Sequence, residues 1–91
     1  DKLNNLPYVA ESVVVQRGEK FYGLVYPDQD AYKKENITKE KMQQIMEDNR
    51  KTLNTQVAAY EQLSGIEIRD EEFEKTPKKS IKRFLYNNIE I

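Results

Sequence analysis

VAESVVVQRGEKFYGLVY, residues 9–26, is the stretch of sequence that decides the fold. Its run of three valines at 13–15 is β-branched throughout, which favours a strand buried on both faces, and we predict that strand over residues 9–16. Residues 17–20 contain Gly18 and are typical of a tight turn, and residues 21–26 predict a second strand. The two strands should form a hairpin. Tyr22 and Tyr26 share a strand face with Leu24, and we expect their rings to pack against a helix rather than to stack on nucleic-acid bases.

The middle of the chain carries the clearest helical pattern. Residues 27–36 predict a surface connection, and Thr38 then caps a helix. The polar residues 49–52 interrupt its apolar stripe, which predicts a bend or a break, and Gly65 is placed to end its second half. We interpret the part of this stripe from Met42 to Val57 as core, with a partner-docking groove as the alternative. Its apolar positions, at spacings of mostly three and four, are Met42, Ile45, Met46, Leu53, Val57, Tyr60 and Leu63.

The two flanks complete the predicted architecture. Residues 1–5 are consistent with the end of a helix that Pro7 limits. Residues 66–71 alternate roughly between apolar and acidic side chains and predict a third strand. With 91 residues there is room for one core. We therefore predict a single α+β domain over 1–91: a small three-stranded sheet, made of a hairpin plus a third strand, packed against one or two helices.

Composition excludes several classes of function. The chain has 15 basic and 16 acidic residues and neither cysteine nor histidine, so a disulfide framework, a thiolate zinc site and a Ser-His-Asp machine are impossible within it. Its three glycines stand far apart, which excludes glycine-rich phosphate loops. No metal site is predicted, and no apolar run is long enough to cross a bilayer. The neighbouring carboxylates Asp70, Glu71 and Glu72 are interpreted as a solvated face rather than as an acid–base pair.

The most informative polar feature is a basic run between residues 75 and 83. It contains Lys75, Lys78, Lys79, Lys82 and Arg83, and Pro77 prevents a regular helix or a central strand there. Such a run is either a solvated loop or a loop that contacts phosphate groups. The net charge of −1 and the acidic residues just before the run argue against nucleic acid.

Three segments in a fixed order carry a resemblance to a known family. They are LPYVAESVVV (6–15), LVYPD (24–28) and FEKTPKKSIKR (73–83). The chain resembles, over nearly its whole length, the C-terminal domain of adenylate-forming AMP-binding enzymes, specifically the long-chain fatty-acid–CoA ligases, or acyl-CoA synthetases. The third segment is similar to the family's last motif, which reads proline or threonine, a few polar residues, Gly-Lys, an aliphatic residue, any residue and arginine.

The resemblance implies an activity for a longer protein. A fatty-acid carboxylate attacks the α-phosphate of ATP to give an acyl-adenylate and diphosphate, and coenzyme A then displaces AMP to form the thioester. The small domain, 1–91, would rotate against a large N-terminal domain, its partner, which would bind ATP, magnesium and the acyl chain. Because the sequence starts at Asp1, we expect a fragment that binds no cofactor of its own and is inactive alone. The implied location is cytoplasmic, with or without peripheral attachment of the full-length enzyme to a membrane.

The motif at residues 76–86 departs from the family at its central position. If Ile81 and Arg83 fix the register, Ser80 occupies the position of the family's catalytic lysine and Lys79 that of its glycine. We predict that Lys79 supplies the cation from one residue earlier; the alternative is a first half-reaction that is slowed or supported differently. Further candidates for contacts to phosphate or coenzyme A are Lys78, Lys82 and Arg83. The alternative function is a small non-enzymatic module that binds phosphate groups or nucleic acid through residues 75–83.

Overall fold

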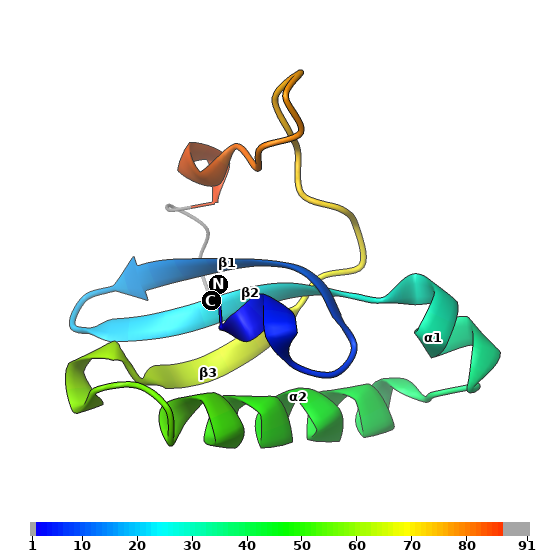
Figure 1. Cartoon of the computed structure of the whole chain (residues 1–91), viewed down its shortest axis with the longest axis horizontal. Coiled ribbons are helices and arrows are strands. Elements are labelled where there is room, and N and C mark those ends of the chain that lie inside the picture. Colours follow the sequence, from blue (N-terminus) through cyan, green and yellow to red (C-terminus); the bar gives the residue numbers. More distant parts are fainter. Residues whose placement is uncertain (1, 87–91) are drawn as a thin grey trace.

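A computed structural model, which describes residues 2–86, shows a three-stranded mixed sheet between one long helix and a C-terminal segment (Figure 1). The predicted α+β class and small sheet are confirmed. The strands follow the chain in the order β1-β2-β3, and α2 lies on one face of the sheet while the segment after β3 rises from the other. The elements are β1 (Val9–Arg17), β2 (Lys20–Pro27), α1 (Gln29–Lys34), α2 (Lys39–Asn54) and β3 (Leu63–Ile68), with short 3-10 helices η1 (Leu3–Asn5), η2 (Ala59–Glu61) and η3 (Arg83–Leu85).

The predicted hairpin is confirmed. Strands β1 and β2 are antiparallel, and Arg17 faces Lys20 across the turn, where Gly18 has a φ of 62°. Glycine tolerates this left-handed backbone because it has no Cβ. The expectation that β1 is buried on both faces is wrong in part: Val13 and Val15 are buried, whereas Val14 is 38% exposed. Within residues 2–86, β1 is an edge strand of the sheet. Its Val14 lies on the α2 side, where α2 leaves it partly uncovered beside a pocket.

The third strand lies earlier than predicted and runs parallel to β2. It spans residues 63–68 instead of 66–71, and the Arg69 N–H donates to the Val25 carbonyl at 2.7 Å where the ladder ends. Gly65 does not end a helix, because it pairs with Tyr22 inside the sheet. A parallel strand requires a crossover, which α1 and α2 supply.

Helix α2 is continuous across residues 49–52, so the predicted bend is wrong. Thr38 caps it as expected, its hydroxyl accepting from the Lys41 N–H at 3.1 Å. Asn49, which sequence reasoning treated as a break, is buried and donates its side-chain amide to the Pro7 carbonyl at 2.8 Å. The predicted extension of the helix to residue 63 is also wrong: Asn54 ends it and pairs with both backbone groups of Leu63, at 2.8 and 3.0 Å.

Two segments expected to be simple are more structured. The connection at 27–36 contains the short helix α1, capped by the Asp28 carboxylate, which accepts from the N–H groups of Asp30 and Ala31. Near the N-terminus, η1 buries Leu3 against the sheet. Both segments add apolar contacts to the side of the sheet that α2 covers.

The core consists of two clusters, one on each face of the sheet. The inner cluster confirms the methionine stripe as core; its buried members are Leu3, Val25, Met42, Met46, Leu53 and Leu63. The outer cluster contains Val13, Val15, Leu24, Phe73 and Tyr86. Tyr22 and Tyr26 lie on the face of Leu24 as predicted, but they pack against this outer cluster and not against a helix.

Candidate functional site

The basic run forms a narrow hairpin that we call the arm, residues 74–82. Lys75 and Ile81 form an antiparallel bridge at its base, and the Thr76 N–H donates to the Ser80 carbonyl at 2.8 Å. Thr76 also organises the turn: its carbonyl accepts from the Lys79 N–H at 2.8 Å and its hydroxyl from the Ser80 N–H at 3.3 Å. Figure 1 shows the tip of the arm, residues 76–80, standing away from the sheet. The hydrogen bonds of Thr76 therefore define the conformation of the turn that contains Pro77.

The tip contains a left-handed residue that is not glycine. Lys79 has a φ of 65°. Such a backbone costs an L-residue about 1–2 kcal/mol, because its Cβ approaches the next carbonyl oxygen. A glycine at position 79 would avoid this cost, because glycine has no Cβ.

Most cations of the arm point to solvent. Lys78, Lys79 and Arg83 are exposed and Lys82 is half-buried. Within residues 2–86 no hydrogen bond or ion pair engages their charged groups. They are free to meet an external anion. The structure therefore brings all four predicted site cations to one arm and its base.

Lys75 differs from the other cations because it is a structural anchor. Its ammonium forms an ion pair with Glu11 of β1 at 2.5 Å and donates to the Phe73 carbonyl at 3.3 Å. The hydrogen bond to Glu11 raises the pKa of Lys75 above its ordinary value. This pair joins the base of the arm to the sheet.

An aromatic cluster also anchors the arm, and the sequence analysis missed it. The rings of Phe73 and Tyr86 meet edge to face with centroids 4.9 Å apart, and the Arg69 guanidinium lies 5.1 and 4.9 Å from their centroids. The Tyr86 hydroxyl accepts from the Glu74 N–H at 2.6 Å, and its carbonyl accepts from Arg17 at 3.0 Å. The sequence did contain a signal for this cluster: Phe73 and Tyr86 stand within a charged segment, and large aromatic side chains usually bury their rings.

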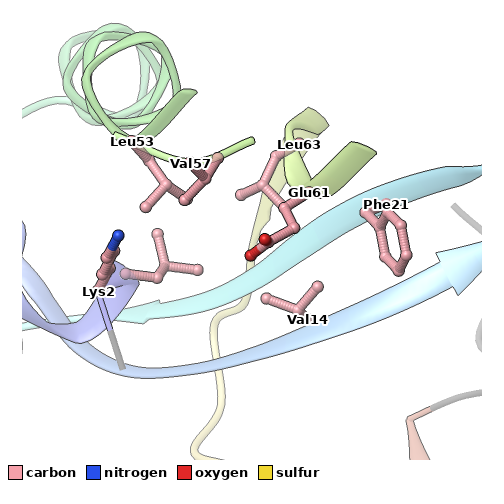
Figure 2. Close-up of a pocket in the computed structure, with 8 residues that line it drawn as sticks. Lys2, Val14, Phe21, Leu53, Val57, Glu61 and Leu63 are labelled. Carbon is pink, nitrogen blue, oxygen red and sulfur yellow. The ribbon is translucent and has the colours of Figure 1, made fainter. Parts of the chain in front are cut away.

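A separate pocket of about 440 Å³ lies on the α2 side of the sheet (Figure 2). Its walls are mostly aliphatic, and the Lys2 ammonium, which donates to the Gln56 carbonyl at 3.0 Å, stands at its edge. Figure 2 shows the Glu61 carboxylate pointing into the space between Leu63 and Val14. The pocket does not communicate with the arm, because Leu63 belongs to the inner cluster and the arm packs on the outer one. It offers no convergent set of phosphate-binding donors.

Across residues 2–86 no three acidic side chains come close enough to hold a metal ion. Asp70, Glu71 and Glu72 are exposed, as expected for a solvated face. Within the same part of the chain, no helix is both long and apolar enough to cross a membrane.

Searches of protein-family models and of curated proteins find no match to this chain.

Proposed function

We propose that this chain is the small C-terminal domain of a long-chain fatty-acid–CoA ligase, with the tip of the arm acting at an active site on a larger upstream domain. The observation that carries the proposal is the left-handed backbone at Lys79, where the family motif has glycine. The order of a hairpin, a helix, a third strand and a basic loop supports the same assignment. On this proposal ATP, magnesium and coenzyme A bind to the whole enzyme, which acts in the cytoplasm, and the isolated chain is inactive.

The arm suits a role in stabilising transition-state charge. When a fatty-acid carboxylate attacks the α-phosphate of ATP, negative charge shifts along the phosphate oxygens as diphosphate leaves, and a cation placed there lowers the barrier. The Lys79 ammonium stands on a turn fixed by three hydrogen bonds with Thr76, and no group within residues 2–86 pairs with it. Lys78, Lys82 and Arg83 are placed to meet phosphate groups of ATP or coenzyme A.

The test uses the natural polypeptide that carries these residues. Fatty-acid-dependent exchange of labelled diphosphate into ATP measures the first half-reaction, and transfer from a supplied acyl-adenylate to coenzyme A measures the second. We expect Lys79→Ala to slow the exchange about 100-fold while the transfer changes far less. Lys33→Ala, the matched control on α1, should leave the exchange within about threefold, because it removes the same charge from an exposed lysine outside the arm.

The outcomes separate the enzyme from its proposed residue. Absence of fatty-acid activation by the unmodified polypeptide would overturn the ligase assignment. Equal effects of Lys79→Ala and Lys33→Ala would keep the ligase assignment and remove Lys79 from its mechanism.

The alternative, a module that binds phosphate groups, is favoured by the same unpaired cations. Filter binding of the 91-residue chain to an oligonucleotide at two salt concentrations distinguishes it, because phosphate contacts make affinity fall steeply with salt. Binding that is strong at low salt and lost at high salt supports the module, and no binding at low salt eliminates it.

A further inference from the structure

Two large apolar side chains next to the arm remain in water. Phe84 is 68% exposed and Leu85 is 41% exposed, both on η3. Tyr86, the next residue, is buried in the outer cluster, and its N–H donates to the Arg83 carbonyl at 3.0 Å. A 3-10 helix turns once in three residues, so burial of Tyr86 directs the two residues before it away from the core. Their exposure is thus a consequence of how the segment is anchored.

Four cations lie near this apolar pair along the chain. Lys82 and Arg83 precede Phe84 directly, and Lys78 and Lys79 lie on the tip of the same arm. We call these four cations together with Phe84 and Leu85 the basic apolar patch. Within residues 2–86, no ion pair neutralises its charges. A patch that combines free cations with exposed apolar side chains can gain from two sources at once, anionic headgroups and the apolar boundary beneath them.

Acidic residues near the patch do not cancel it. Asp70, Glu71 and Glu72 precede Phe73, on the stretch that leaves the sheet before the arm begins. Glu74 is opposite Lys82, whose N–H donates to the Glu74 carbonyl at 2.8 Å, so it faces one cation at the base of the arm. The tip and η3 carry no carboxylate.

We propose that the basic apolar patch docks the domain on the surface of an anionic lipid bilayer. A bilayer fits better than a nucleic acid because aliphatic Leu85 is exposed next to Phe84, whereas base stacking uses only aromatic rings. The docking is peripheral: the cations meet lipid headgroups, and Phe84 and Leu85 enter the boundary with the acyl chains. This proposal does not depend on the ligase assignment, because it concerns the 91-residue chain alone.

Vesicle cosedimentation tests the proposal. The 91-residue chain is mixed with phosphatidylcholine vesicles with and without phosphatidylserine, at low and high salt. We expect partition onto the anionic vesicles only, decreasing with salt. Phe84→Ser should weaken that partition about tenfold, since the ring no longer enters the interface. The double variant Lys78→Gln with Lys79→Gln should weaken it about fivefold for each cation removed.

Matched controls locate the effect on the patch. Tyr60→Ser removes an aromatic ring that is 78% exposed on η2, and Lys33→Gln with Lys34→Gln removes the same charge from α1. Both controls should retain the partition of the unmodified chain. Circular dichroism checks that each variant keeps the fold, which exposed substitutions should not disturb.

Three results would overturn the proposal. The first is no partition onto anionic vesicles at low salt. The second is a control variant that loses as much partition as its counterpart on the patch, which would indicate general charge or stickiness. The third is tight binding of a single-stranded oligonucleotide, with an affinity that Phe84→Ser does not change and that added vesicles barely reduce. That result would make the surface a nucleic-acid interface.

Discussion

The left-handed backbone at Lys79 permits a sharp test by glycine substitution. Replacing Lys79 with glycine removes the clash of its Cβ, worth about 1–2 kcal/mol, and adds chain entropy to the unfolded state, which costs about 0.5–1 kcal/mol. The net change is about zero to 1.5 kcal/mol of stabilisation. Lys78, the neighbour in the same turn, has no positive φ. Lys78→Gly therefore brings only the entropic cost and should destabilise the domain by about 0.5–1 kcal/mol.

The comparison of the two glycine variants cancels the effect of charge, because each loses one exposed lysine. We expect Lys79→Gly to be about 1–2 kcal/mol more stable than Lys78→Gly. The turn should report on global unfolding, since the bridge between Lys75 and Ile81 and the burial of Phe73 join the arm to the outer cluster. In a domain of this size each kcal/mol shifts the melting temperature by about 4–8 °C.

The measurement is thermal unfolding followed by circular dichroism, supported by urea titration. Equal stabilities for the two variants would refute the reasoning, because residue 79 would then not occupy the left-handed region in solution. That result would also remove the main support for aligning Lys79 with the family's glycine.

Other predictions concern the anchors of the arm and of α2. Phe73→Ala should destabilise the domain by about 3–5 kcal/mol, whereas Phe84→Ala, at an exposed ring, should stay within about 0.5 kcal/mol; equal losses in urea titration would contradict the outer cluster. Asn49→Ala should cost about 1–3 kcal/mol because it leaves a carbonyl without its donor, and an unchanged melting temperature would argue against that bond. Because the pKa of Lys75 is raised in the folded domain, its pair with Glu11 contributes stability at pH values below the ordinary lysine pKa. That stability is lost as pH rises through the pKa of Lys75 in the folded domain. The difference in the free energy of unfolding between wild type and Glu11→Gln should therefore shrink at alkaline pH. A difference that stays constant throughout the alkaline range would show that Lys75 does not titrate against Glu11.

Local signals predicted the hairpin and much of the helix. Three consecutive β-branched residues specify the first strand, and the nearby turn with Gly18 specifies where the chain reverses. The start of α2 was equally local, since Thr38 caps it through its own side chain. These features depend little on the rest of the fold.

The end of the helix and the place of the third strand depend on tertiary contacts, so sequence periodicity could not locate them. Leu63 continues the three- and four-residue spacing of the helical stripe, yet it is the first residue of β3, where Asn54 satisfies its backbone groups. Asn49 is a polar residue within the apolar stripe, yet it is buried, because its side-chain amide donates a hydrogen bond to the Pro7 carbonyl. A polar residue can be part of a core only when its partner is known.

The sequence predicted which cations the candidate site contains, but not the contacts that attach the arm to the sheet. The basic run identified the cations of the arm, whereas Arg69, Phe73 and Tyr86 acquire their role only when the segment folds back over the sheet. Glu11 and Lys75 meet although they lie 64 positions apart in the sequence, and nothing local distinguished Lys75 from the cations that remain free.

The geometry of the turn also bears on which residue would act as the cation in the proposed ligase. Backbone groups of position 80 form two hydrogen bonds with Thr76, whereas position 79 forms one and has the strained backbone. Preorganisation favours a cation on the more firmly held position, because a charge that must be ordered during the reaction stabilises the transition state less. Ser80→Lys in the natural polypeptide, with Lys79 retained, should therefore accelerate diphosphate exchange. An unchanged or slower exchange would indicate that the active site is already built around Lys79.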